Sequence, residues 1–484
     1  MRQRRLPLSI AFSALLLAGC ASVPTLKPAG QPLAAADVGL HPGIDVQIAP
    51  DWWTAMGDPQ LDRLMADALA GNPTLAQAQA RLRQAQASLA VNRAGQLPQL
   101  GVDGEETRER FSEKYIIPPP YGGSTQWVGS TQANLSWALD LAGRQAALVD
   151  QARADVNAVA LDGAAARVTI AGAVAQAYVD LIRADRQIAI AQDFRASREE
   201  SVRLAQSRVR NQLASQFDIR AAETLLAEAR QAQVRAEGDR ALIVHALAAL
   251  AGRGADYYAG IGAPTLTFDK VMPVPDALPA DLLGRRPDLL AALARVDAAN
   301  AGRRVARADF YPNVDLKAFL GVQAIGLGAL FTGGALTYGG GPAIHLPLFE
   351  GGRLKAGYEG ATAQVDLAIA QYNGLVLGAV REAADALSAI QTAQADAAEQ
   401  KQVLASLNDT VRLDQTRLRT GLGSQLDTIA SAERLLQAGQ AQVNIAADGA
   451  TRRIQLVVAL GGGFDPLISK PSKAALSSDA GARP

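Results

Sequence analysis

The stretch Leu348-Phe349-Glu350-Gly351-Gly352-Arg353 repeats an earlier one, Leu139-Asp140-Leu141-Ala142-Gly143-Arg144. Seventy-one residues beyond each arginine stands a serine, which opens the segments Ser215-Gln216-Phe217-Asp218 and Ser424-Gln425-Leu426-Asp427. Twenty-five residues separate two prolines in each half, Pro73 from Pro98 and Pro287 from Pro312. Spacing this regular over such lengths indicates an internal duplication, with one copy at residues 72–252 and the other at residues 286–462.

Each copy contains a long proline-free segment that we interpret as a helical rod. The rods begin at Arg144 and Arg353, and about 67 residues at about 1.5 Å per residue give a length of about 100 Å. Each rod is expected to meet a short turn, at 211–216 and 421–424, and to return as a second helix. Seven-residue spacing of apolar side chains in the last helix predicts a coiled-coil seam, formed by Leu422, Ile429, Leu436, Val443, Ala450 and Val457.

The segments between the prolines and the rods alternate like β-strands. In the first pair, Trp127, Leu135 and Trp137 share one face, whereas Gln132 and Asn134 share the other. Apolar residues toward lipid and polar residues toward a lumen are typical of transmembrane strands. Four strands cannot close a barrel, and an open sheet edge cannot lie in lipid. We therefore predict a mixed α/β membrane protein that combines long coiled-coil helices with one barrel shared by several protomers.

The predicted domains follow the two copies. We expect a signal peptide at 1–19, a lipidated N-terminal segment at 20–71, the first repeat at 72–252, an equatorial linker at 253–285, the second repeat at 286–462 and a tail at 463–484. The strand pairs are expected at about 99–141 and about 313–349.

The N-terminus predicts export and lipidation. Basic residues precede an apolar stretch from Leu6 to Ala18 that is too short to span a bilayer. Leu17-Ala18-Gly19-Cys20 resembles a bacterial lipobox, which implies cleavage before Cys20 and its lipidation. An ordinary signal peptide followed by an incidental cysteine is the alternative, but Cys20 is the only cysteine and has no disulfide partner. Ala21 in place of aspartate implies the outer membrane.

Composition argues against catalysis and nucleic-acid binding. Net charge is zero, so no basic surface is indicated. The three histidines, His41, His245 and His345, lie far apart and lack metal-ligand spacing. No nucleophile elbow or phosphate-binding loop is present. No apolar stretch after the signal reaches eighteen residues, so no transmembrane helix is expected. We predict no enzyme activity and no cofactor.

Several motifs together resemble the TolC-type outer membrane factors of the NodT/OprM lipoprotein branch. They include Asp51-Trp52-Trp53, Gly57-Asp58-Pro59, Arg285-Arg286-Pro287-Asp288, Tyr311-Pro312 and the glycine-rich stretch before Arg353. The resemblance implies a homotrimer with a twelve-stranded barrel above a periplasmic tunnel of helices. It also implies that the chain is the exit duct of a drug efflux pump, with a periplasmic adaptor and an inner-membrane transporter of the RND type as partners. A protein-secretion channel and a poreless coiled-coil lipoprotein are the alternatives.

The resemblance also places the gate at the periplasmic tips. Relatives often carry an acidic ring near the second turn, where this chain has Gly423, so the nearest acidic candidates are Asp427 and its repeat partner Asp218. Both could instead cap the returning helices. Arg417 and Arg419 either hold the closed tip by ion pairs or are solvated. The candidate adaptor-contact residues are Asn211, Gln212, Leu213, Gly421, Leu422, Gly423 and Ser424.

Overall fold

The computed structural model describes residues 23–40, 48–268 and 282–465. Cys20 and the predicted signal peptide lie outside these residues, as do His41, part of the predicted linker and most of the tail. Within them the chain forms two compact units. The first contains Arg81–Val159 and Ala291–Tyr372, and the second contains Leu33–Ala80, Ala160–Leu290 and the chain from Asn373. Each unit thus draws segments from both sequence repeats.

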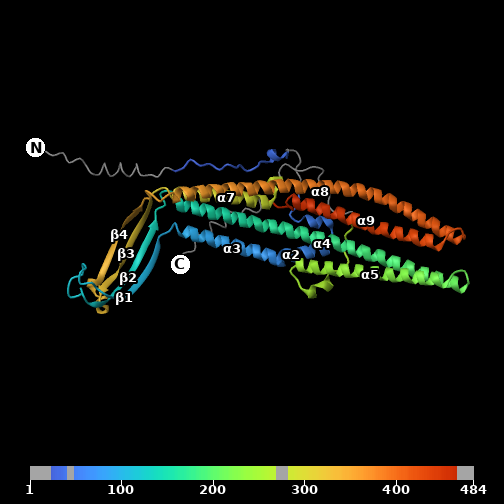
Figure 1. The fold of residues 1–484 in the computed structure, drawn as a ribbon, viewed down its shortest axis with the longest axis horizontal. Helices are drawn as coiled ribbons and strands as arrows, with labels where there is room; N and C mark the ends of the chain where they lie inside the picture. The colour runs from blue at the N-terminus through green and yellow to red at the C-terminus, as the bar shows by residue number, and fades with distance from the viewer. Residues whose placement is uncertain (1–22, 41–47, 269–281, 466–484) are drawn as a thin grey trace. The chain divides into compact units, whose positions relative to one another are not determined.

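The first unit contains a four-stranded antiparallel sheet with the order β1-β2-β3-β4 (Figure 1). Its strands are β1 Gln99–Arg110, β2 Thr125–Ala138, β3 Asn313–Ile325 and β4 Leu336–His345. Pro98 and Pro312 directly precede β1 and β3, where proline ends the helical conformation of the chain before it. The connections 111–124 and 326–335 join the strands at one end of the sheet. β1 and β4 form its two open edges.

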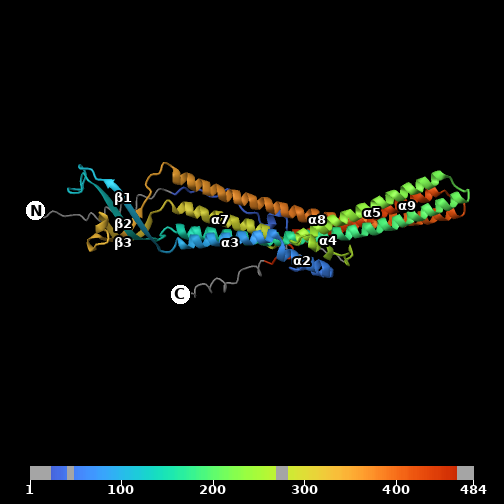
Figure 2. The same ribbon diagram turned by 90° about the horizontal axis from the view of Figure 1, so that it is seen from below.

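Four helices carry the two hairpins of the second unit, and they match in length between the repeats. They are α4 Arg144–Arg210 and α8 Arg353–Arg419, with 67 residues each, and α5 Gln216–Leu250 and α9 Gln425–Ala459, with 35 residues each. In the second unit α4 runs antiparallel to α5, and α8 to α9, so that each pair ends in a tight turn (Figures 1 and 2). Arg240 of α5 pairs with Asp185 of α4 at 2.5 Å.

Shorter helices complete the described chain. They are α2 Pro59–Gly71, α3 Pro73–Ala94, α6 Leu282–Arg285 and α7 Pro287–Ala308, with short 3-10 turns at Ala35–Val38, Trp52–Met56, Ala255–Gly260, Leu327–Ala329 and Gly333–Ala335. α2, α3 and α7 begin at a proline, which suits the first helical turn because its missing N–H has no partner there.

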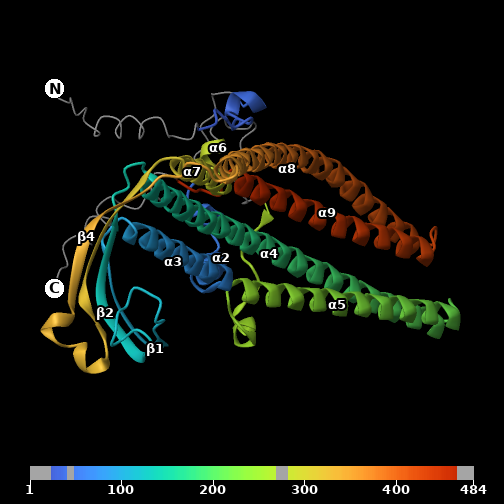
Figure 3. The same ribbon diagram turned by 60° about the vertical axis from the view of Figure 1, so that its left-hand side comes forward.

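The N-terminal segment is anchored by the core of the second unit. Trp52 is 2% exposed and packs with Leu61, Leu64 and Tyr178, none of which is accessible to solvent. Asp58 caps α2 by accepting a hydrogen bond from the Gln60 N–H at 2.9 Å. The two tryptophans therefore act as packing anchors on the helices. Figure 3 shows α2, the helix that follows them, beside α4.

Equivalent contacts close both hairpins at the ends of their returning helices. The Asn72 side chain donates a hydrogen bond to the Leu250 carbonyl of α5 at 2.8 Å. The Arg286 guanidinium donates to the Ala459 carbonyl of α9 at 3.2 Å and also pairs with Asp288 and Glu382. Leu250 and Ala459 lie 209 residues apart, which is also the spacing of Ser215 and Ser424. They are therefore equivalent positions, and the two repeats use different side chains to satisfy the same helix end.

One helix in the described part of the chain, α4, is long and apolar enough to cross a membrane by length and composition. The sequence prediction counted only uninterrupted apolar stretches and so passed over it. The signal is weak, because a helix that packs against others passes the same test. Here Arg183 of α4 pairs with Asp448 of α9 at 3.0 Å, which favours a packing role.

Candidate functional site

The first hairpin tip ends α4 with two backbone hydrogen bonds. The Leu213 N–H donates to the Arg208 carbonyl at 2.8 Å, and the Gln212 N–H donates to the Val209 carbonyl at 3.0 Å. Gln212 between them has a φ of 60°. This is the Schellman arrangement, in which one left-handed residue lets the last carbonyls of a helix find partners.

The second tip repeats this geometry with a more suitable residue. The Leu422 N–H donates to the Arg417 carbonyl at 2.8 Å, and the Gly421 N–H donates to the Leu418 carbonyl at 3.3 Å. Gly421 has a φ of 76° at the position equivalent to Gln212. Glycine adopts this conformation without a Cβ clash, whereas glutamine is strained there by roughly 1 kcal/mol. The two tips therefore share one backbone but differ in strain.

Gln212→Gly is expected to stabilise the first tip by about 1 kcal/mol, because it removes that strain. Gly421→Ala is expected to destabilise the second tip by a similar amount. Amide hydrogen exchange of residues 211–218 and 420–427 measures these local effects, since tips open without global unfolding. Gln212→Ala is the control, because it shortens the side chain but keeps the left-handed Cβ. Equal protection in the Gly and Ala variants would show that no strain is stored at Gln212.

The predicted gate aspartates both act as helix caps. Asp218 accepts hydrogen bonds from the Ser215 N–H at 2.7 Å and from its hydroxyl at 3.0 Å. Asp427 accepts from the Ser424 hydroxyl at 2.8 Å and from its N–H at 3.2 Å. These bonds lower the pKa of both carboxyls. The capping interpretation therefore describes their contacts, and both aspartates are charged at neutral pH.

An arginine accompanies each aspartate at its tip. The Arg208 charge lowers the pKa of Asp218, after the larger effect of the Ser215 hydrogen bonds, and Arg417 does the same for Asp427 after Ser424. Arg208 also donates to the Gln425 side chain at 3.4 Å, which connects the two tips. Among the described residues, the ion pairs within 4.0 Å do not include Arg417 or Arg419. Sequence reasoning missed Arg208, although it lies 209 residues before Arg417 and is its repeat partner.

Both tips expose large apolar side chains to solvent. Leu213 and Phe217 are 69% and 77% exposed, and Leu422 and Leu426 are 76% and 72% exposed. The prediction that Leu422 starts the coiled-coil seam is therefore wrong, because it lies in the turn before α9, whereas the seam residues from Ile429 onward are half-buried or buried. The apolar tips offer a surface that a partner protein could cover.

A buried arginine lies between the hairpins above the tips. Arg198 of α4 is 2% exposed, and its guanidinium stacks on Phe194 at 4.4 Å. Burial lowers the pKa of Arg198, although the negative charges of Glu433 on α9 and Glu228 on α5 act to raise it. Its Nε and Nη2 atoms have no hydrogen-bond partner among the described residues. The equivalent residue in the second repeat is Leu407. Comparison of the two repeats therefore does not predict a buried arginine at position 198.

The sheet has one apolar and one polar face. Leu100 and Val102 of β1 pair across the ladder with Leu135 and Ala133 of β2, and Trp127 and Trp137 stand on the same face. Trp127 and Trp137 are ten residues apart, which is about 34 Å along a strand. When strands are tilted as in a membrane barrel, this length rises by roughly 25 Å, which is the height of a lipid-facing band. The ten-residue spacing of Trp127 and Trp137 therefore matches the separation of the two aromatic girdles in membrane barrels.

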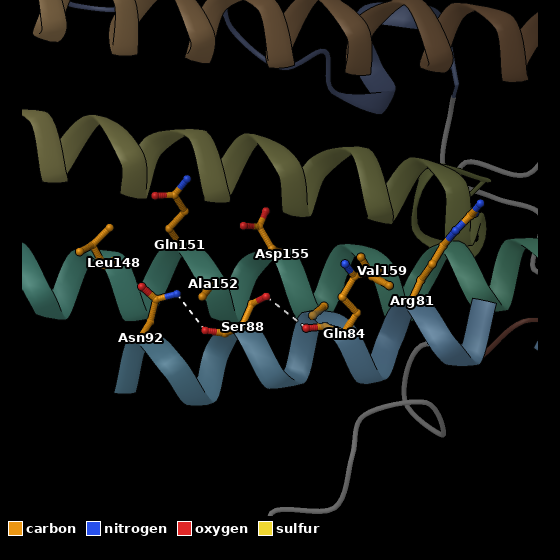
Figure 4. A pocket seen from close by; sticks show the side chains of 10 residues that line it. Arg81, Gln84, Ser88, Asn92, Leu148, Gln151, Ala152, Asp155 and Val159 are labelled. Atoms are coloured by element: carbon orange, nitrogen blue, oxygen red, sulfur yellow. Dashed lines mark hydrogen bonds between the residues drawn. The ribbon is translucent and has the colours of Figure 1, made fainter. Parts of the chain in front are cut away.

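A cleft of about 600 Å³ lies in the first unit between α3 and α4 (Figure 4). Amide, hydroxyl and apolar side chains line it, together with Arg81 and Asp155. Burial raises the pKa of Asp155, although the positive charge of Arg295 acts to lower it. No group of His, Cys, Asp or Glu within the described residues could hold a metal ion. The cleft brings together no nucleophile or acid–base pair.

The chain resembles known proteins in both sequence and structure. Residues 64–253 and 278–462 match the family model described as outer membrane efflux protein. The chain is 30% identical to the outer membrane protein OprJ of Pseudomonas aeruginosa, over 96% of this chain and 97% of OprJ. It is 35% identical to the fusaric acid resistance protein FusA of Burkholderia cepacia, over 74% of this chain and 70% of FusA. The crystal structure of the outer membrane protein VceC of Vibrio cholerae superposes with a TM-score of 0.79 and 32% identity, covering 87% of this chain and all of VceC.

Proposed function

Because this chain belongs to the outer membrane efflux protein family, we propose that it is a trimeric exit duct that conducts small molecules passively from an inner-membrane transporter to the cell exterior. Its place is the outer membrane, and its role is efflux. The observation that carries the duct is the four-stranded sheet, with one apolar face and two open edges.

The barrel in this proposal requires more than one copy of the chain. β1 and β4 run antiparallel to each other, since four strands alternate in direction. β1 of one protomer can therefore pair with β4 of the next, and three copies give twelve antiparallel strands without an edge. Closure is required in lipid, because unpaired strand N–H and carbonyl groups cannot be hydrated there. The helix α3 adds support, since none of its residues is buried in the single chain.

The gate in this proposal lies at the two hairpin tips. Opening is a movement of one hairpin against the other, a two-state change that a partner can bias. Arg208, Gln425, Asp218 and Asp427 are the polar groups at these tips, and the Arg208–Gln425 bond is the connection that opening would break. The exposed Leu213, Phe217, Leu422 and Leu426 are the proposed contacts for a periplasmic adaptor, and an RND-type transporter supplies the energy.

The lipid anchor is part of the same proposal. Cys20 stands at the cleavage position of the lipobox-like stretch, and acylation there would attach the N-terminus to the outer membrane. Mass spectrometry of the purified N-terminal peptide tests this point separately from channel activity.

Single-channel conductance of the purified protein in a planar bilayer tests the duct. The parent is expected to show a small, flickering conductance, and Asp427→Ala and Asp218→Ala are expected to lengthen the openings several-fold, because the tip turns lose their caps. Asp239→Ala, an exposed aspartate within α5, is the matched control and should resemble the parent.

Two results would contradict the proposal at different levels. Conductance that is equal in all four proteins would remove the aspartates from the gate but keep the duct. Lack of conductance, together with a monomer on native gels and no strand signal in circular dichroism, would instead favour a poreless coiled-coil lipoprotein.

A further inference from the structure

The ladder register assigns every strand residue to one of two faces. On the polar face, Asp103, Glu105 and Glu109 of β1 stand opposite Gln132, Ser130 and Gln126 of β2. On the same face, Ser136 and Ala138 of β2 stand opposite Lys317 and Asp315 of β3. Side chains that pair across successive ladders point to the same side of a sheet. These charged residues therefore share one surface.

The charges on this face are unequal. It carries four carboxylates, of Asp103, Glu105, Glu109 and Asp315, against the single ammonium of Lys317, which leaves three negative charges per protomer. The three β1 carboxylates are exposed. Asp103 accepts a hydrogen bond from the neutral Asn134 amide at 2.7 Å, and Glu105 from the Thr107 hydroxyl at 3.4 Å. The salt bridges of the described strands do not include any of these carboxylates, so their charge is not neutralised locally.

The opposite face of the sheet carries a different set of charges. Its charged residues are Glu106, Arg108 and Arg110, all at the loop end of β1. Arg108 lies over the Trp127 ring at 5.7 Å, and Arg110 donates to the Gly123 carbonyl at 2.6 Å. The remainder of that face is uncharged. The charged residues of that face sum to one positive charge, so only the side that the proposed barrel turns inward carries a net negative charge.

The strand that would meet β1 in a trimer cannot mask this charge. On the polar face β4 presents Thr337, Gly339, Gly341, Ala343 and His345, which the register places opposite residues of the same parity in β3. None of these side chains is a lysine or an arginine. The β1 carboxylates would therefore remain open to the lumen beside β4 of the next protomer.

We propose that Asp103, Glu105 and Glu109 determine the charge selectivity of the channel, so that cations and cationic or neutral cargo pass more readily than anions. The inference deepens the proposed function and rests on its barrel. It concerns the sign of the field along the lumen wall and places no ion at a fixed site. A lumen with charge of one sign and low-dielectric walls concentrates counter-ions and repels co-ions.

The reversal potential in a KCl gradient measures this selectivity. The parent is expected to be several-fold more permeable to K⁺ than to Cl⁻ near 0.1 M salt, and less selective near 1 M, where the screening length falls from about 10 Å to about 3 Å. The triple variant Asp103→Asn, Glu105→Gln, Glu109→Gln keeps the side-chain shapes and should bring the ratio close to one. Glu106→Gln is the matched control, since the neighbouring glutamate lies on the opposite face.

A thiol-labelling experiment tests the negative potential at the lumen wall and does not require the tips to be open. Ser130→Cys stands opposite Glu105 on the polar face, and Thr131→Cys stands opposite Gly104 on the apolar face. In liposomes, Ser130→Cys should react faster with a trimethylammonium methanethiosulfonate than with the sulfonate analogue. The triple variant should lower the ratio of the two rates several-fold, when each rate is taken relative to that of the same reagent with a free thiol. Parent protein without the added cysteine gives the background.

The outcomes separate the inference from the proposed function. An unselective or anion-selective parent, or a parent-like ratio in the triple variant in both experiments, would overturn the role of these carboxylates while leaving the duct intact. Equal labelling of Thr131→Cys and Ser130→Cys in liposomes would instead contradict the barrel itself, and the inference with it.

Discussion

Replacing Gly252 or Gly461 by alanine is expected to destabilise the protein by about 3–5 kcal/mol, because each position combines left-handed backbone with a close backbone approach. Gly252 has a φ of +69°, and an added Cβ would lie 2.1 Å from the Gly71 carbonyl oxygen. Gly461 has a φ of +98°, and its Cβ would lie 2.2 Å from the Arg285 carbonyl oxygen. Neither oxygen belongs to a flexible side chain, so the chain itself must move.

Thermal unfolding in detergent and the yield of assembled protein measure this effect. Gly238→Ala is the matched control, because an added Cβ there meets no atom within 4 Å and alanine favours the helix interior by about 1 kcal/mol. We expect the control to be as stable as the parent or more stable. If Gly252→Ala and Gly238→Ala unfold alike, the close approach to Gly71 is not a feature of the folded protein.

The large elements of the fold were accessible to sequence reasoning because their signals are long and periodic. The proline-free segments after Arg144 and Arg353 correspond to α4 and α8, and the alternation of β2 and β3 is visible in the sequence alone. β1 was harder to read. Its second half, from Glu105, alternates poorly because charges stand on both faces, although the strand continues to Arg110.

The tips and the ends of the hairpins were only partly predictable. The sequence identified Asp218 and Asp427, and the capping interpretation agrees with their hydrogen bonds. The duplication could also have identified Arg208 as the partner of Arg417, and Gly252 as the partner of Gly461, because each pair lies 209 residues apart. It could not have identified Arg198, whose burial depends on tertiary packing and whose repeat partner is apolar.

Assignment of the sheet faces needed the register as well as the alternation. Each strand alone gives two alternating sets of side chains, but not which set of one strand adjoins which set of the next. The pairing of Glu105 with Ser130, and of Ser130 with Gln323, places the carboxylates of β1 beside the polar residues of β2 and β3. A shift of one residue would have put Glu105 on the apolar face. The charge of the lumen wall is therefore a property of the register.

The second large effect is expected at Asp58, where one buried carboxylate satisfies several donors. One oxygen accepts from the Thr265 N–H at 2.9 Å, the Thr265 hydroxyl at 3.1 Å and the Leu266 N–H at 2.9 Å, and the other caps α2 through Gln60. Asp58→Asn replaces one oxygen by a donor, which leaves N–H groups without partners. We expect a loss of about 2–4 kcal/mol at neutral pH, measured as a lower unfolding midpoint in urea.

The pH dependence distinguishes a lost charge from lost packing. Burial raises the pKa of Asp58, but the hydrogen bonds from Tyr178, Gln60, Leu266 and Thr265 together outweigh it, so the pKa is lowered. The unfolded chain binds the proton more tightly, and this stabilisation is present above the ordinary aspartate pKa of about 3.9 and is lost as pH falls below it. The stability difference between the parent and Asp58→Asn should therefore shrink below about pH 4. Asp51→Asn, an exposed aspartate seven residues earlier, should change stability by less than about 0.5 kcal/mol at any pH. A difference at Asp58 that stays constant down to pH 3 would show that packing, not the charged hydrogen bonds, holds residues 265–266 against α2.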